Sequence, residues 1–271
     1  MIIDFHSHAF PEKIAARTIE TLIANTARIT DYPMKNHTDG TARGLIEAEK
    51  AAGVDLAVVL PIVTNPKQTE TINRVAKETN DANCGLYSFC SIHPADPDAI
   101  MWVYKLAEDG FKGLKLHPEF QTFFADSDEA IAVYRRAAEH GMTIILHAGR
   151  DIGYPPPVHA TPDMLLRAVD KVPNLRLVAA HFGGWMMWDE VASKLVGSPI
   201  YFDTAFIADF IEPSLARDII NAHGAEKVLF GSDAPWEDPA HTLGFLRSLG
   251  FEKEKLDSIC GDNAARLLGL K

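Results

Sequence analysis

The chain has 271 residues, of which 47% are hydrophobic, and its 37 acidic and 26 basic residues give a formal net charge of -11 at pH 7. This acidic balance argues against a nucleic acid or an anionic membrane surface as the main partner. No apolar stretch approaches the roughly 20 residues of a membrane span, and the N-terminus lacks a signal-peptide pattern, so we expect a cytoplasmic location. The three cysteines are widely spaced without a CxxC motif, and we expect them to be reduced and mostly buried.

Short β-rich runs recur along the chain, with segments of helical pattern between them. Several runs are apolar almost throughout, which is typical of parallel strands that are covered on both faces. The predicted strands are 1–6, 55–62, 84–92, 111–117, 142–148, 175–181, 199–206 and 227–233.

The segments between these strands carry helix start and stop signals. A helix over 41–53 ends in Gly53, Ser127 is a plausible cap for a helix over 127–141, and Thr161 precedes another helix. Each strand-helix unit has about 30 residues, as expected for strands joined by crossover helices. Eight such units favour a (β/α)8 TIM barrel over a doubly wound sheet, which more often has five to seven strands.

The first unit is longer than the others. Residues 9–53 separate its strand from the next, and 24–41 is predicted to be an inserted loop near the barrel mouth. The sequence has no linker and no low-complexity run, so residues 1–271 are expected to form a single domain.

Polar residues follow or end several of the predicted strands. Because the carboxyl ends of barrel strands converge on one face, these side chains are expected to meet there. His6 and His8 alternate along one strand and therefore project to the same side, where two imidazoles can hold one ion. A purely structural role for all of them is less plausible, because each buried imidazole would need hydrogen-bond partners. The residues are His6, His8, His117, His147, His181 and Asp233.

The motifs around these positions resemble the amidohydrolase superfamily. They are "DFHSH", "GLKLHP", "ILHAG", "VPNLRLVAAHFGG", "LFGSDAPW" and "ICGDNAARLLGL", and together they cover nearly the whole chain. The resemblance is greater to the amidohydrolase-related branch, which includes aminocarboxymuconate-semialdehyde decarboxylase, resorcylate-type decarboxylases, hydrolases and lactonases.

The resemblance implies a role for each matching residue. His6, His8, His147 and Asp233 match the ligands of one divalent metal ion, for which zinc is expected and manganese is the alternative. His181 matches the histidine that orients or deprotonates the metal-bound water in single-metal decarboxylases, or binds a second ion in two-metal members. Members of this branch often form homodimers, although no stretch of this sequence marks an interface.

Lys115 leaves the number of ions open. Two-metal amidohydrolases bridge their ions with a carbamylated lysine from the fourth strand, where Lys115 lies. The preferred interpretation is that Lys115 pairs with an acid or contacts the substrate, so that a single metal is expected and a second is not excluded.

The predicted chemistry uses the ion to lower the pKa of a bound water from about 15.7 to near 7. His181, with an ordinary pKa near 6.5, is suited to move a proton at neutral pH, and Asp233 is a candidate both for metal binding and for proton transfer.

Four residues are candidate contacts to a small organic substrate. Arg150 is placed to grip a carboxylate, although a surface salt bridge is an equally good reading. Trp236 adjoins Asp233 and is expected in the substrate wall. Lys115 and His117 complete the set.

These features predict a metal-dependent hydrolase of an amide, ester or lactone. The nearest alternative is a non-oxidative decarboxylase (carboxy-lyase) of an aromatic or unsaturated acid, which needs the same site. The chain is shorter than many decarboxylases of the branch, which favours hydrolysis. A metal-free lactonase and a non-catalytic barrel that binds a metal or metabolite are further alternatives.

Overall fold

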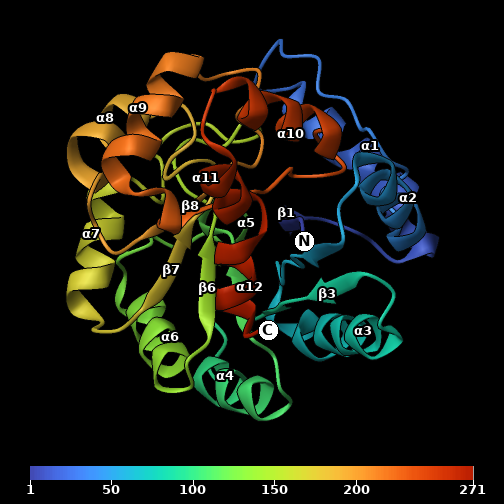
Figure 1. Cartoon of the computed structure of the whole chain (residues 1–271). Helices are drawn as coiled ribbons and strands as arrows, with labels where there is room; N and C mark the ends of the chain where they lie inside the picture. Colours follow the sequence, from blue (N-terminus) through green and yellow to red (C-terminus); the bar gives the residue numbers. More distant parts are fainter. Residues whose placement is uncertain (271) are drawn as a thin grey trace.

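The computed structural model describes residues 1–270. Figure 1 shows parallel strands with helices around them. All eight predicted strands are present, and the predicted strand 84–92 is split in two by Phe89. The strands are β1 (Ile3–Ser7), β2 (Leu56–Val59), β3 (Leu86–Ser88), β4 (Cys90–Ser91), β5 (Gly113–Leu116), β6 (Thr143–Leu146), β7 (Arg176–Ala179), β8 (Tyr201–Asp203) and β9 (Val228–Leu229).

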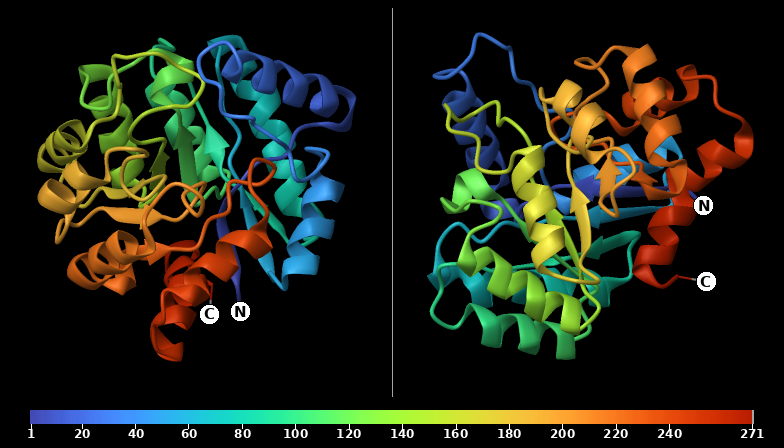
Figure 2. Two further views of the ribbon diagram at one scale, coloured as in Figure 1. Left: turned by 90° about the horizontal axis from the view of Figure 1, so that it is seen from above. Right: turned by 90° about the vertical axis from the view of Figure 1, so that its left-hand side faces the viewer.

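The strands close into a barrel. Strands β1, β2 and β3 pair in parallel, as do β4 to β9 in order. The Phe89 amide between β3 and β4 donates to the Val59 carbonyl at 3.0 Å, which keeps these two strands in one line. On the other side, the Phe5 amide donates to the Phe230 carbonyl at 2.8 Å, and Ser7 forms a parallel bridge with Ala234. The predicted (β/α)8 TIM barrel is therefore confirmed, and Figure 2 shows it from two further sides.

The helices surround the strands, and three of them begin where the sequence predicts. The side chains of Thr41, Ser127 and Thr161 each accept a hydrogen bond from a backbone amide in the first helical turn, as N-cap residues do. The helices are α1 (Glu12–Thr26), α2 (Ala42–Ala52), α3 (Thr69–Ala82), α4 (Ala99–Glu108), α5 (Pro118–Gln121), α6 (Asp128–Glu139), α7 (Pro162–Lys171), α8 (Trp188–Glu190), α9 (Pro213–His223), α10 (Pro239–Ser248), α11 (Lys253–Asp257) and α12 (Asn263–Leu268).

The segment 24–41 differs in part from the prediction. Its first three residues end helix α1, which the sequence analysis did not predict. The remainder lies near the mouth of the barrel, as expected, because the His37 amide donates to the Pro235 carbonyl at 2.7 Å. Pro235 follows Asp233, so this segment covers the loop that carries one of the predicted site residues.

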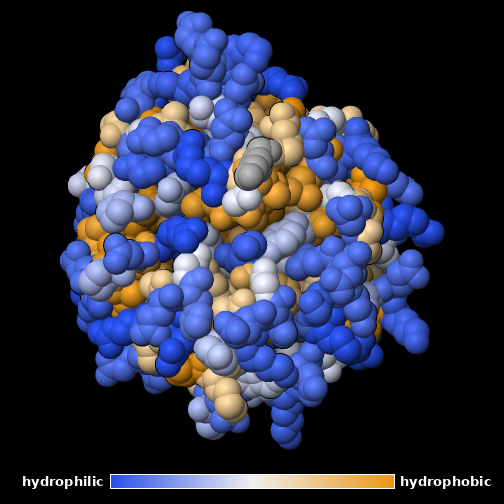
Figure 3. Space-filling view, turned by 60° about the horizontal axis from the view of Figure 1, so that its bottom comes forward, coloured by the Kyte–Doolittle hydropathy of each residue, from blue (hydrophilic) through white to orange (hydrophobic). Residues whose placement is uncertain are grey.

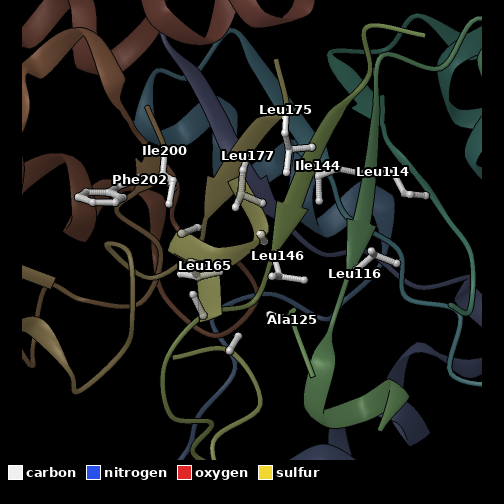
Figure 4. Close-up of a cluster of buried hydrophobic side chains, with 14 of the residues drawn as sticks. Leu114, Leu116, Ala125, Ile144, Leu146, Leu165, Leu175, Leu177, Ile200 and Phe202 are labelled. Atoms are coloured by element: carbon white, nitrogen blue, oxygen red, sulfur yellow. The ribbon is translucent and has the colours of Figure 1, made fainter. Parts of the chain in front are cut away.

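Two apolar layers hold the barrel together. Side chains on successive residues of a strand point to opposite faces. On β6, Ile144 and Leu146 belong to the cluster between the strands and the helices, and Ile145 belongs to the barrel interior. Figure 4 shows the outer cluster, with Leu114 and Leu116 of β5 beside the pair from β6. The apolar packing of the interior ends toward the barrel mouth, where Lys115 and the polar residues that follow the strands lie.

One face of the molecule is mostly polar. Figure 3 shows a largely hydrophilic face with apolar residues gathered in patches near its middle. No helix within residues 1–270 is both long and apolar enough to cross a membrane. The expectation for the cysteines is wrong in one respect, because Cys84 is exposed, whereas Cys90 is buried and Cys260 is half-buried.

Candidate active site

All nine predicted site residues line one cavity of about 1050 Å³ at the carboxyl ends of the strands. The barrel brings them together from five different strands or the loops that follow them, namely β1, β5, β6, β7 and β9. They are His6, His8, Lys115, His117, His147, Arg150, His181, Asp233 and Trp236.

Three of the four predicted metal ligands converge on one point. The Asp233 Oδ1 atom lies 3.1 Å from His8 Nε2 and 3.3 Å from His6 Nε2. All potential ligand atoms of this group lie within 4.8 Å of one another. The three side chains therefore form a compact cluster of two imidazoles and one carboxylate.

The hydrogen bonds of the two imidazoles fix which nitrogen faces the cluster. His8 Nδ1 lies 2.9 Å from the Leu60 carbonyl, which can only accept, so this nitrogen carries the proton. His6 Nδ1 lies 2.8 Å from Asp203 Oδ2 and donates to that carboxylate. In both neutral rings the Nε2 lone pair then faces Asp233. Three electron-pair donors that face one another are a suitable set for a divalent cation such as zinc.

The surroundings favour the neutral form of His6 and the ionised form of Asp233. Burial, and next the charge of Lys115, hold the pKa of His6 well below its ordinary value. Burial alone would raise the pKa of Asp233, but His8, whose Nε2 atom lies 3.1 Å away, and the other neighbouring imidazoles lower it overall. A neutral imidazole and an ionised carboxylate are the forms that bind metals.

Asp203 positions two of the site histidines. Its carboxylate accepts from His6 Nδ1 and, at 2.9 Å, from the backbone amide of His181. Asp203 is fully buried. Such a partner fixes the tautomer and the orientation of a metal-binding imidazole.

We expect Asp203→Asn to weaken metal binding by about 10-fold to 100-fold, because the carboxylate that orients His6 is lost. The measurement is the dissociation constant of Zn²⁺ or Mn²⁺ by titration calorimetry. Asp218→Asn, at an exposed position on α9, is the matched control. Unchanged affinity in Asp203→Asn would show that His6 is oriented by other contacts.

His147, the fourth predicted ligand, lies in a second cluster. Its Nε2 atom is 3.6 Å from Asp151 Oδ2, and His117 Nε2 is 3.3 Å from the same oxygen. The rings of His117 and His147 are stacked, with centroids 4.2 Å apart. The potential ligand atoms of His117, His147 and Asp151 also lie within 4.8 Å of one another, so these residues form a second candidate group, and metal binding by His147 together with His6, His8 and Asp233 stays a prediction.

Two acids that were not predicted from the sequence lie beside this second cluster. Asp151 follows Arg150 and lies four residues after His147. This closeness in sequence to two predicted site residues is the feature that could have identified it. Glu119 is 5% exposed, and its Oε2 atom lies 3.8 Å from His117 Nδ1. Burial raises the pKa of Glu119 to about 7.

Lys115 lies on β5 and reaches the first cluster. It is fully buried, and its Nζ atom lies 3.2 Å from His6 Nε2. Burial lowers the pKa of Lys115 to about 8, although three neighbouring carboxylates act in the opposite direction. Lys115 therefore carries a positive charge on the floor of the cavity at neutral pH. A modest rise in pH removes its proton and with it this charge.

His181 stands between the two clusters. Its ring centroid is 5.1 Å from that of His6 and 4.7 Å from that of His147. Its Nδ1 atom donates to the Ala205 carbonyl at 2.9 Å, which leaves Nε2 free to exchange a proton in the cavity. His181 and Asp233 both have positive φ, at 56° and 72°, a strained backbone that costs roughly 1–3 kcal/mol per residue and is concentrated at functional sites.

The cavity walls are aromatic near the clusters. Trp236, the predicted wall residue, lines the cavity together with Trp185 and Phe206. Arg150 is exposed at its edge and forms no salt bridge within residues 1–270, so its guanidinium is free for an anionic ligand. The arrangement combines a polar, histidine-rich floor with apolar walls.

A buried acid pair lies behind the first cluster. Asp4 on β1 accepts from the backbone amides of His6 and Ser232, at 2.9 Å and 3.0 Å. Glu49 of α2 is 4% exposed, and its carboxyl group lies against that of Asp4, to which a protonated Glu49 can donate a hydrogen bond. Burial, and next the charge of Asp4, raise the pKa of Glu49 to about 11. Glu49 is therefore protonated in the folded protein at neutral pH.

We expect the folding stability of the wild type to fall as the pH rises from 6.5 to 8.5, and Glu49→Gln to reduce this dependence. The folded state keeps the Glu49 proton up to about pH 11, whereas the unfolded chain loses it near its ordinary value of 4.5. Between these values one proton contributes a loss of up to about 1.4 kcal/mol per pH unit. Urea unfolding at the two pH values gives the free energy of unfolding of both proteins. An equal change of this free energy with pH in the wild type and in Glu49→Gln would show that Glu49 is ionised when folded.

The fold and the clustered ligands define a TIM-barrel enzyme with a candidate metal centre. The chain belongs to the amidohydrolase family, because the profile of that family matches residues 3–270. No curated protein matches the sequence.

Solved structures share the fold along the whole chain. For 5-carboxyvanillate decarboxylase from Sphingomonas paucimobilis, the TM-score is 0.75 at 16% identity, covering 100% of this chain and 99% of the other. For 2,6-dihydroxybenzoate decarboxylase in complex with 2,6-dihydroxybenzoate, it is 0.73 at 16% identity, covering 99% of both chains. For 5-carboxyvanillate decarboxylase from Novosphingobium aromaticivorans, with manganese and 4-hydroxy-3-methoxy-5-nitrobenzoic acid, it is 0.75 at 15% identity, covering 100% and 96%.

Proposed function

We propose that the protein is a metal-dependent, non-oxidative decarboxylase of an aromatic acid. The observation that carries this proposal is the cavity itself, in which aromatic walls enclose a floor that holds the cationic Lys115 beside His6, Asp233 and His181. The walls suit an aromatic ring, and the floor suits the carboxylate that the ring bears. The three similar structures named above are decarboxylases of acids of this class, which supports the same choice.

The reaction adds a proton to the ring carbon that bears the carboxylate. The bond between this carbon and the carboxylate then breaks, its electron pair returns to the ring, and carbon dioxide leaves. His181 is the proposed proton donor: its Nδ1 atom stays bonded to the Ala205 carbonyl, so the doubly protonated ring gives up the proton on Nε2 and is left neutral. Lys115 and Arg150 would hold anionic oxygens of the substrate, and the aromatic walls would orient the ring.

The proposed cofactor is one divalent ion, zinc or manganese, held by His6, His8 and Asp233. When bound, it would supply positive charge to substrate oxygens. The manganese in the 5-carboxyvanillate decarboxylase of Novosphingobium aromaticivorans supports the choice of ion. His147 stays a predicted ligand of this ion. In the structure its Nε2 atom faces Asp151.

Hydrolysis of an ester, amide or lactone is the second candidate. The observation that favours it is the second cluster of His117, His147 and Asp151, because two adjacent ions are common in hydrolases. Carbamylation of Lys115 belongs to this alternative.

The test is a comparison of products from protein loaded with one equivalent of Mn²⁺ or Zn²⁺. Hydroxybenzoic acids are assayed for carbon dioxide release, and lactones, esters and anilides for hydrolysis. The proposal requires carbon dioxide and the matching phenol in equal amounts, with loss of both in His181→Asn. Hydrolysis without carbon dioxide release from any aromatic acid would establish the second candidate instead.

A further inference from the structure

The cavity extends well beyond the residues described above. One branch leaves the barrel mouth and runs between the outer face of the strands and the helices α1 and α3. We call this branch the side lobe and define it by Val59 of β2, Leu86 of β3, Ile72, Val75 and Thr79 of α3, and Thr18 of α1, all of which line the same cavity as His6 and Asp233.

The strand residues show that the side lobe lies outside the barrel interior. Val58 and Leu60 belong to the interior cluster. Val59, between them, points to the opposite face and packs in a separate cluster with Leu86 and with Leu45 of α2. Both Val59 and Leu86 are largely buried, at 6% and 4% exposure.

The helix residues form the opposite wall. Val75 and Thr79 are four residues apart on α3, and Ile72 is three residues before Val75, so all three share one face of the helix. They are half-buried, and they contribute methyl groups to the cavity. The side lobe is therefore a mostly apolar channel between a helix and the outer face of two strands, and Ser88 of β3 is a polar residue in its lining.

An apolar space of this kind is unusual in a folded domain. The layer between strands and helices is normally packed without voids larger than a water molecule. Apolar cavities stay dry and bind apolar ligands. The whole cavity, at about 1050 Å³, is at the upper end of the range that holds drug-sized ligands, and a single-ring acid would fill only its polar part.

We propose that the side lobe binds an extended apolar substituent of the substrate. The substrate class is then an aromatic acid whose ring carries a long alkyl chain, with the carboxylate beside Lys115 and the chain along α3. This inference rests on the proposed function, because it places the acid at the candidate active site. We assign the side lobe to a part of the substrate because it is continuous with that site.

The test measures binding, so it does not depend on turnover. Mn²⁺-loaded protein is titrated with 2-hydroxybenzoic acid and with its 4-alkyl derivatives of two, four, six and eight carbons. We expect the dissociation constant to fall by about threefold to fourfold for each added CH2 until the side lobe is full. Equal affinity for all chain lengths, or weaker binding of the longer acids, would overturn the proposal.

Two variants test where the alkyl substituent binds. Thr79→Phe fills the side lobe, so it should remove the gain with chain length and leave the affinity for unsubstituted 2-hydroxybenzoic acid unchanged. Lys77→Phe adds the same ring at an exposed position of α3 that does not line the cavity, and it should behave as the wild type. If Thr79→Phe does not fold, Val75→Phe replaces it. If the affinity still rises with alkyl length in a folded side-lobe variant, the alkyl substituent binds elsewhere and the proposal is wrong.

The same experiment separates this inference from the proposed function. Carbon dioxide release from the unsubstituted acid tests decarboxylation alone. A gain in affinity with chain length but no decarboxylation would retain the side lobe and remove the decarboxylase. Affinity independent of chain length, in a dimer that Thr79→Phe converts to a monomer, would assign the side lobe to a second copy of the chain and overturn the inference.

Discussion

The Asp233→Asn variant is expected to keep the barrel but lose its divalent ion and at least about 10³-fold of its turnover. Asp233 is the one carboxylate of the first cluster, and its Oδ1 atom lies within 3.3 Å of both imidazole Nε2 atoms. An amide keeps the size of the side chain but not its charge, so two neutral imidazoles would remain to hold the ion. The lost turnover follows from the lost charge stabilisation at the substrate.

Asparagine is a suitable replacement because the backbone of residue 233 has a φ of 72°. Asparagine is tolerated in this left-handed region better than most residues, so the loop should not rearrange. Elemental analysis gives the metal content per chain, and circular dichroism checks the fold. The control is Asp218→Asn, which makes the same change at an exposed site. A variant that keeps one equivalent of metal and full turnover would remove Asp233 from the centre.

His181→Asn is expected to separate chemistry from metal binding. We expect metal content to remain at the wild-type level while kcat falls by about 10²-fold to 10⁴-fold, the usual loss when a positioned acid or base is removed. The His181 ring lies beside the His6 ring, but its Nδ1 atom is bonded to the Ala205 carbonyl, outside the first cluster. The φ of 56° at this position also tolerates asparagine.

The measurement pairs elemental analysis with single-turnover kinetics on the same preparation. His241→Asn, at a partly exposed histidine of α10, controls for the loss of an imidazole. If metal content drops in step with kcat, His181 is a ligand, and the two-metal alternative gains support over the single ion.

The sequence predicted the barrel because its evidence is local and repeated. Apolar runs of strand length, cap residues such as Thr41 and Ser127, and a repeat of about 30 residues are all visible without three-dimensional information. The spacing of His6 and His8 is equally local, since alternation along a strand places both on one side. The homodimer and the cytoplasmic location have no comparable local evidence and stay predictions.

The features that the sequence could not predict depend on side-chain orientation and on long-range contacts. His147 ends the expected strand, but only the packed structure shows that its ring stacks on His117 and faces Asp151. Glu49 looks like an ordinary helix residue until α2 places it against Asp4. The side lobe depends on how α1 and α3 pack beside β2 and β3, which no periodicity encodes.

The first cluster joins distant parts of the chain, since 225 positions separate His8 from Asp233. During synthesis at the ribosome, the two histidines emerge long before the carboxylate does. A growing polypeptide that has folded only its early strands offers two imidazoles, a weak and incomplete set for a metal ion. Tight capture of the ion therefore waits for the last strand to close against the first, and we expect metal acquisition to report completion of the barrel.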